Sequence, residues 1–147
     1  MIDWPQGLRG HSDADVLTHA VIDSLLGAAA LGDIGRHFPD TDKRYANIRS
    51  TELLREVRII IGDKGWSISN IDSVLVAEAP RLAPYLDEMR SRLAEVCGIS
   101  MEAVSVKATT SEGMGFTGRG EGIEARAVAL ITRHADGGDK DACQIRA

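Results

Sequence analysis

A histidine and two carboxylates near the start of the chain have a spacing that suits metal binding. Asp15, His19 and Asp23 are four residues apart, so they would form one row along a helix. A carboxylate can hold the second ring nitrogen of a histidine in place, which favours the histidine as a metal ligand. Zinc takes about three or four protein ligands, however, and this row offers only one imidazole. The row therefore predicts either part of a metal site or the solvated face of a helix.

Polar residues on both sides of this row could bind an anion or a sugar. His11 and Ser12 precede the expected helix, where free backbone N–H groups and the helix dipole attract phosphate. Ser12 would then donate a hydrogen bond, or it would only cap the helix. Asp33, Asp40 and Asp42 lie in a later stretch without periodicity. Paired carboxylates can bind sugar hydroxyls or a divalent cation, but aspartate is also common in turns.

The glycine-rich segment KATTSEGMGFTGRGEG, residues 107–122, gives a more specific signal. Thr109, Thr110 and Ser111 come directly after a predicted strand, where ligands of α/β proteins tend to bind. Glu112 adds a carboxylate, and the glycines expose backbone N–H groups. The segment has neither the GKS or GKT of a Walker A loop nor a GxGxxG that opens a helix. It therefore predicts a ligand-binding loop of another kind, with a plain flexible loop as the alternative.

The elements that would position these residues alternate along the chain. Apolar periodicity predicts helices and strands, and a long loop joins the first two helices. The expected helices cover residues 12–30, 50–63 and 82–97, the expected strands 66–79, 104–109 and 123–133, and the loop 33–49. Ser12 or Asp13 should cap the first helix and Ser50 the second. This order predicts one α/β domain with a thin, three-stranded sheet.

Composition narrows the class of protein. The chain has 147 residues, of which 44% are apolar and 27% charged, as is typical of one soluble globular domain. Its net charge is −5 without a run of Lys or Arg, so neither nucleic acid nor an anionic membrane is an expected partner. There is no long apolar span and no signal-peptide pattern, and Cys97 and Cys143 form no CxxC. We therefore expect free thiols and a cytoplasmic location.

Three segments together resemble the 2-C-methyl-D-erythritol 2,4-cyclodiphosphate synthase family over about residues 7–132. They are GHSDADVLTHAVIDSLLGAAALGDIGRHFPDTD, AEAPRLAP and VKATTSEGMGFTGRGEGIEARAVAL. The resemblance implies a small mixed β-sheet with helices packed on one side, assembling as a homotrimer with its active sites between subunits. It also implies a phosphorus–oxygen lyase of the non-mevalonate route to isoprenoid precursors. That enzyme converts 4-diphosphocytidyl-2-C-methyl-D-erythritol 2-phosphate into the cyclic diphosphate and CMP.

The same resemblance assigns expected roles to individual residues. His19 matches a zinc ligand, and Glu112 matches the carboxylate that holds Mg²⁺ or Mn²⁺ between the phosphates. Thr110, Glu112 and His11 are the expected catalytic residues, and His11 with Ser12 would contact the methylerythritol phosphate. The remaining expected contacts are Asp33, Gly35 and Asp40 for the methylerythritol, Ala77, Arg81, Leu82, Ala108, Thr109 and Thr110 for the cytidine diphosphate, and Phe116 and Arg119 for a cavity on the trimer axis.

The resemblance is incomplete at the start of the chain. The family begins with a strand whose D-x-H pair supplies two zinc ligands, and this sequence contains no D-x-H. We therefore expect an N-terminally truncated synthase domain over residues 1–133 with an incomplete Zn²⁺ site, and a disordered tail over 134–147. The alternative is a catalytically impaired trimer that serves as a phosphate-ligand scaffold or as a partner of the preceding pathway enzyme. Arg126, where the family commonly has Glu or Gln, would add positive charge near Arg119.

Overall fold

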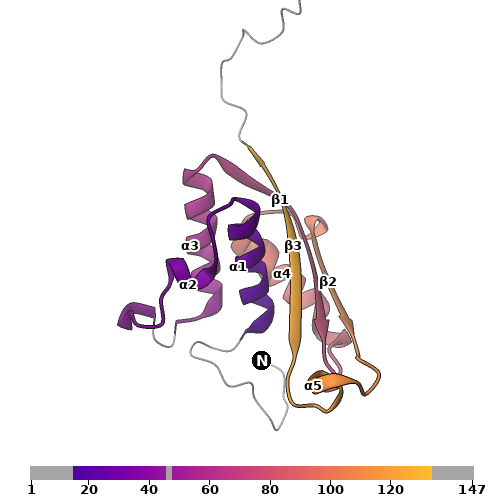
Figure 1. Cartoon of the computed structure of the whole chain (residues 1–147). Coiled ribbons are helices and arrows are strands. Elements are labelled where there is room, and N and C mark those ends of the chain that lie inside the picture. The colour runs from indigo at the N-terminus through magenta and orange to yellow at the C-terminus, as the bar shows by residue number, and fades with distance from the viewer. Residues whose placement is uncertain (1–14, 46–47, 134–147) are drawn as a thin grey trace, which may run out of the picture.

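The computed structural model describes residues 15–45 and 48–133, which form a layer of helices on one face of a three-stranded sheet (Figure 1). The elements in chain order are α1 (Val16–Ala28), α2 (Ile34–His37), η1 (Lys43–Tyr45), α3 (Ser50–Asp63), β1 (Trp66–Val76), η2 (Ala83–Tyr85), α4 (Leu86–Cys97), η3 (Met101–Ala103), β2 (Val104–Thr109), α5 (Gly115–Gly118) and β3 (Glu124–Arg133). The predicted tail over 134–147 lies outside the described residues. The predicted α/β order of long helices and strands is confirmed.

The sheet is mixed, with β1 in the centre. β2 pairs with β1 in parallel and β3 pairs with it antiparallel, which gives the order β2-β1-β3. Along β1, Ile71, Ser73 and Leu75 are buried and the residues between them are half-buried, because successive side chains point to opposite faces. The predicted small mixed sheet is therefore confirmed, although β1 ends at Val76 and not at residue 79.

Three long helices cover the inner face of the sheet. α1 packs against β3, α4 packs against β2, and α3 packs against both helices (Figure 1). The core between these layers consists mainly of aliphatic side chains from the three long helices, β1 and β2, including the fully buried Ile22, Leu54 and Ile71, and β3 adds half-buried side chains. Burial of each such side chain contributes about 1.5–3 kcal/mol. Among the described residues, no helix has the length and apolar character that crossing a bilayer requires.

The outer face of the sheet is the face that points away from these helices. In β3, Ala127 and Ala129 pack against the core, so Val128 and Leu130 point outward and are 73% and 60% exposed. Val74 of β1 shares the outer face and is half-buried. Within the described part of the chain no helix covers these side chains. Exposed apolar side chains such as Val128 and Leu130 are typical of interaction surfaces, and on this face they adjoin Arg126 and the ion pair of Asp72 with Lys107.

The two predicted helix caps are wrong. α1 begins at Val16 with Asp15 as its N-cap, so neither Ser12 nor Asp13 caps it. The Asp15 carboxylate accepts hydrogen bonds from the Thr18 N–H at 3.0 Å and from the Thr18 hydroxyl at 2.6 Å. Three residues of HSDAD are good caps, and the sequence does not say which of them the chain will use.

α3 also begins differently from the prediction. Arg49 occupies its N-cap position without a side-chain hydrogen bond, and Ser50 lies inside the first turn, fully buried. The loop predicted over 33–49 contains the short α2 and η1. The third predicted helix begins at Leu86, after η2, and ends as expected at Gly98. Gly98 has a φ of +66°, the left-handed conformation that commonly ends a helix.

Candidate active site

The carboxyl ends of β1 and β2 lie side by side because these strands are parallel. Val76 and Thr109 are in register, and Ala77 donates its N–H to the Thr109 carbonyl at 3.0 Å. The segments that leave these ends, 77–82 and 110–113, are therefore neighbours. Ligands of α/β sheets bind beyond the carboxyl ends of parallel strands, so this end of the sheet is the candidate site.

The structure brings the six expected cytidine diphosphate contacts to this end of the sheet. Ala77 and Leu82 are buried, whereas Arg81, Ala108, Thr109 and Thr110 are exposed. The Thr109 hydroxyl donates to the Thr110 carbonyl at 3.2 Å. The accessible part of this surface thus consists of hydroxyl groups, backbone and one guanidinium group, which are groups that bind phosphate and polar bases.

Glu78 joins the two segments, and the sequence had not singled it out. Its Oε1 accepts hydrogen bonds from the Ser111 N–H at 3.0 Å, the Ser111 hydroxyl at 3.1 Å and the Gly113 N–H at 3.1 Å. The hydrogen bond from Gly113 is the main cause that lowers the pKa of Glu78, and those from Ser111 add to it. The one signal in the sequence is an acidic residue directly after the apolar run VLVA.

Glu112 lies between the two backbone groups that bind Glu78. Its φ is +54°, a left-handed conformation that is uncommon for a residue with a side chain. Such conformations persist only where the surroundings hold them, and they occur often at functional sites. The hydrogen bonds of Ser111 and Gly113 to Glu78 provide that support. Glu112 thus combines a fixed backbone with an exposed carboxylate.

The short helix α5 packs directly on this turn at the lower end of the sheet (Figure 1). The buried Thr117 donates its hydroxyl hydrogen to Ser111 Oγ at 2.9 Å. Gly118 comes so close that a Cβ atom there would lie 2.1 Å from the carbonyl carbon of Gly113. Gly118 therefore serves close packing, whereas Gly113, Gly115 and Gly120 have positive φ values and open space around them.

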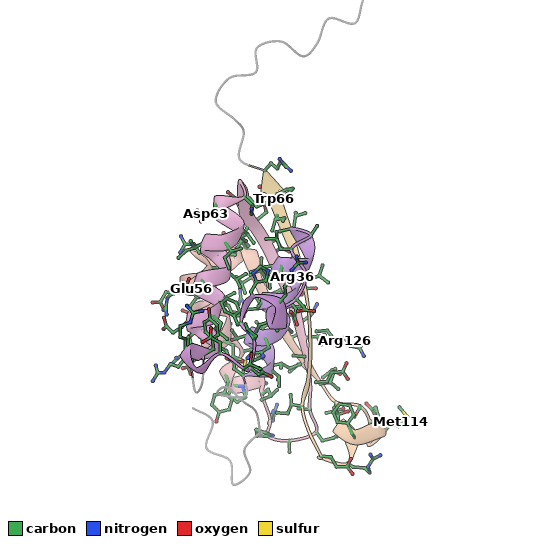
Figure 2. The ribbon with its side chains drawn as sticks, turned by 60° about the vertical axis from the view of Figure 1, so that its left-hand side comes forward. Arg36, Glu56, Asp63, Trp66, Met114 and Arg126 are labelled. Carbon is green, nitrogen blue, oxygen red and sulfur yellow. The ribbon has the colours of Figure 1, made fainter. Side chains whose placement is uncertain are left out.

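The two residues expected on the trimer axis lie on α5 or just after it. Phe116 is 46% exposed, and Arg119 binds both carboxylate oxygens of Glu121 at 2.7 and 2.8 Å. Arg126 projects from the outer face of the sheet, away from the helices (Figure 2), and pairs with Glu124. The positive charge expected from Arg119 and Arg126 is therefore offset by a neighbouring glutamate in each case.

The two carboxylates of the row predicted on α1 bind backbone at the starts of α1 and α2. Asp15 binds Thr18 at the start of α1, as described above, and Asp23 Oδ1 accepts the Ile34 N–H at 2.8 Å. The latter hydrogen bond ties the first residue of α2 to α1. Both carboxylates on either side of His19 thus hold local backbone, a role that the spacing alone did not distinguish from metal binding.

His19 is the expected zinc ligand, and it contacts α3. Its Nε2 lies 2.8 Å from the hydroxyl oxygen of the fully buried Ser50. In residues 15–45 and 48–133, no group of three or more His, Cys, Asp or Glu side chains is placed to hold a metal ion. The described residues therefore do not fit a complete zinc site. His11 and Ser12, the other residues expected at this end, lie outside the described residues.

The loop after α1 presents the residues expected to position the methylerythritol. Asp33, Gly35 and Asp40 are all exposed. Asp33 caps α2, because its Oδ1 accepts the Arg36 N–H at 2.9 Å. Asp42 pairs with Arg44 at 2.6 Å, and this hydrogen-bonded pair lowers the pKa of Asp42. The loop thus has a defined backbone with exposed carboxylates, which suits hydroxyl binding.

A small mixed sheet with one layer of helices and a polar site at its parallel strand ends defines a ligand-binding α/β domain. Residues 1–132 match the family model described as the YgbB family. The chain therefore belongs to the YgbB family.

Two relatives of this chain share one name. A 2-C-methyl-D-erythritol 2,4-cyclodiphosphate synthase from Clostridium acetobutylicum is 52% identical over 130 residues, which are 88% of this chain and 84% of that protein. The protein of the same name from Syntrophomonas wolfei is 60% identical over 126 residues, 86% of this chain and 80% of that one. The resemblance found in the sequence is thereby confirmed.

Solved structures have the same fold. The bifunctional IspDF from Campylobacter jejuni superposes with a TM-score of 0.84 at 39% identity over 87% of this chain, which spans only 35% of that longer chain. The IspF of Plasmodium falciparum, solved as a CDP complex, has a TM-score of 0.76 at 31% identity over 86% of this chain and 76% of that one.

Proposed function

We propose that this chain converts 4-diphosphocytidyl-2-C-methyl-D-erythritol 2-phosphate into 2-C-methyl-D-erythritol 2,4-cyclodiphosphate and CMP, in the non-mevalonate route to isoprenoid precursors. The observation that carries the proposal is the pairing of segments 77–82 and 110–113 through Glu78 and through Ala77 with Thr109. The names of relatives at 52% and 60% identity support the same reaction. They do not favour the alternative of an impaired scaffold.

The reaction is an internal displacement at phosphorus. An oxygen of the substrate's 2-phosphate forms a bond to the β-phosphorus, and the bond from that phosphorus to the oxygen bridging to CMP breaks. CMP leaves with the bridging oxygen, so no water or redox partner enters, and the enzyme acts as a phosphorus–oxygen lyase. Since the nucleophile belongs to the substrate, the protein contributes mainly orientation and stabilisation of charge.

The exposed groups at the strand ends suit this task. The hydroxyl groups of Thr109 and Thr110 would hold the diphosphate in line with the attacking phosphate. The exposed carboxylate of Glu112 would bind Mg²⁺ or Mn²⁺ together with phosphate oxygens, since Mg²⁺ commonly takes one or two carboxylates beside substrate phosphates. A cation bound there would neutralise charge on the phosphates. His11, Ser12 and the loop carboxylates Asp33 and Asp40 would orient the methylerythritol phosphate.

The experiment that tests the function measures both products. The chain is incubated with the substrate and Mg²⁺, CMP is measured by chromatography and the cyclic diphosphate by mass spectrometry. Equal amounts of the two products are expected. Binding of CDP without release of CMP from the substrate would instead support the binding-only alternative.

We place the reaction in the cytoplasm and expect the chain to act as a separate enzyme or beside the preceding pathway enzyme. Cys97 is a buried free thiol, as is common in proteins of a reducing compartment. Burial raises the pKa of this thiol to about 11, so it is unreactive. The relative from Campylobacter is bifunctional, which supports a partner from the same pathway.

The homotrimer is supported by the outer face of the sheet. Val128→Asp would replace an exposed apolar side chain of that face by a second carboxylate opposite Asp72, and burying this unpaired charge against another subunit would cost several kcal/mol. We expect wild type to run as a trimer and Val128→Asp as a monomer in size-exclusion chromatography with light scattering. Ile59→Asp is the control, since Ile59 is 55% exposed on α3 and lies away from this face. A trimeric Val128→Asp variant would refute this interface.

Zinc binding by His19 needs ligands beyond the described residues, and metal analysis tests it. We expect His19→Ala to lose whatever zinc purified wild type retains, while both proteins keep the same mass in solution. Ser50→Ala removes the hydroxyl that lies 2.8 Å from His19 Nε2 but keeps the imidazole, so it should retain zinc. Zinc in His19→Ala equal to wild type would rule out the ligand role, and dissociation of His19→Ala would make His19 structural.

A further inference from the structure

Glu78 makes an unusual set of contacts for a charged residue beside a phosphate-binding site. It takes part in no ion pair with the described Lys and Arg side chains. Its Oε1 accepts three hydrogen bonds instead, from two backbone N–H groups and one hydroxyl group. Hydrogen bonds to a carboxylate are about twice as strong as neutral ones, so this contact holds the turn firmly. Oε1 of the carboxylate is therefore directed at the turn 111–113.

The two backbone donors determine the conformation of the residue between them. Ser111 N and Gly113 N can both reach Oε1 only if the chain turns sharply at Glu112, which has a φ of +54°. Without the carboxylate, Glu112 would relax toward the right-handed conformation that residues with side chains prefer. Its carboxylate would then move relative to Thr109 and Thr110.

The carboxylate of Glu78 also holds together the two segments of the proposed nucleotide site, 77–82 and 110–113. Glu78 follows Ala77, whose N–H binds the Thr109 carbonyl, so it extends the pairing of β1 and β2 past their ends. Ser111 in turn accepts a hydrogen bond from the hydroxyl of Thr117 in α5. One side chain thereby links the segment after β1, the turn after β2 and the short helix that packs on it.

We propose that Glu78 is a positioning residue that fixes Glu112 and the nucleotide segments in one arrangement, so that nucleotide and divalent cation bind together. The proposal rests on the proposed function for the identity of both ligands. It goes beyond it because the proposed function assigns Glu78 no role, whereas here Glu78 acts on both ligands through Ser111 and Gly113. A residue that only stabilised the fold would change the melting temperature without changing the affinity for either ligand.

The test compares Glu78→Ala with Glu78→Gln. Alanine leaves two backbone N–H groups without their acceptor, whereas glutamine keeps an oxygen at the same position. We expect Glu78→Ala to bind CDP about tenfold more weakly in calorimetry. We also expect it to need about tenfold more Mn²⁺ for half-maximal CMP release, and Glu78→Gln to stay within about threefold of wild type in both measurements.

The matched control is Glu56→Ala, because Glu56 is exposed on α3 and lies far from Met114 and the glycine-rich turn (Figure 2). It should equal wild type in CDP and Mn²⁺ binding. If Glu78→Ala does not fold, Ser111→Ala decides the matter, since it removes one donor to Glu78 and the acceptor of Thr117. It should weaken CDP binding about threefold.

The outcomes separate this proposal from the proposed function. Wild-type CDP affinity in a folded Glu78→Ala variant, or in Ser111→Ala if Glu78→Ala is unfolded, would overturn the positioning role even if the melting temperature fell. Weaker CDP binding by Glu78→Ala, together with a wild type that binds CDP but releases no CMP, would support the positioning role and overturn the proposed reaction. A wild type that binds no CDP would overturn both.

Discussion

Replacing Glu112 by Gln should lower the rate of CMP release by about 100-fold at a fixed, low Mg²⁺ concentration. Gln has nearly the same shape and keeps the exposed position at φ +54°, so the turn should remain intact. It lacks the negative charge that a hard divalent cation requires of its oxygen ligands. The rate should therefore recover partly as Mg²⁺ or Mn²⁺ is raised, and a titration of CMP release against each metal measures this.

Glu95→Gln is the control for this prediction, because Glu95 is an exposed glutamate on α4, remote from the parallel strand ends. It should match wild type at every metal concentration. A Glu112→Gln variant with an unchanged metal requirement would show that Glu112 does not bind the cation. A variant with a lower rate that no metal concentration restores would assign Glu112 to proton transfer or to orientation.

The long elements could be predicted because their cores obey simple periods. Leu53, Leu54, Val57 and Ile61 recur at helical spacing and form the buried face of α3, and the helix predicted over residues 50–63 has the observed bounds. β2 was predicted with its observed bounds, Val104–Thr109, since a short strand pattern between turn residues leaves few alternatives. Both features depend on residues that are close together in the chain, so a single sequence is enough to predict them.

Helix ends and the contacts of single polar side chains could not be predicted in the same way. Ser50 has the residue type of an N-cap, yet it is buried inside α3, where its hydroxyl meets His19 of α1. The deciding contact is with a residue 31 positions away. Asp15 was placed in a row that would either bind a metal or face solvent, although the backbone of its own helix uses its carboxylate. In both cases a tertiary or capping hydrogen bond outweighed the local pattern.

A candidate site could be proposed from the sequence, but its internal contacts could not. Polar residues after a strand placed it near Thr109 and Glu112, and the observed parallel pairing of β1 and β2 agrees with that position. Glu78 was missed because its role requires the register of two strands and the backbone of a turn 33 residues further on. Neither of these follows from residue type or spacing. The family resemblance supplied the names of expected contacts, and only the fold brought out the residue that connects them.

Gly118→Ala should be the most damaging of the small substitutions in the glycine-rich segment. A Cβ atom there would lie 2.1 Å from the carbonyl carbon of Gly113, 2.6 Å from its oxygen and 2.8 Å from its Cα. All three atoms are backbone, so no side chain can rotate to make room, and α5 must move away from the turn. Overpacking of this kind costs about 1–3 kcal/mol, and urea unfolding should measure a loss in that range.

The functional loss should exceed what this destabilisation alone would cause. Movement of α5 would break the hydrogen bond from Thr117 to Ser111 and, through Ser111, loosen the turn that holds Glu112. CMP release should fall at least tenfold at a temperature where the variant is still folded. Gly27→Ala is the matched control: nothing lies within 4 Å of the added Cβ on α1, and alanine in a helix stabilises by about 0.5–1 kcal/mol. If Gly118→Ala were as active and as stable as wild type, α5 would not be packed on the turn, and the chain of contacts from Glu78 to Thr117 could not position Glu112.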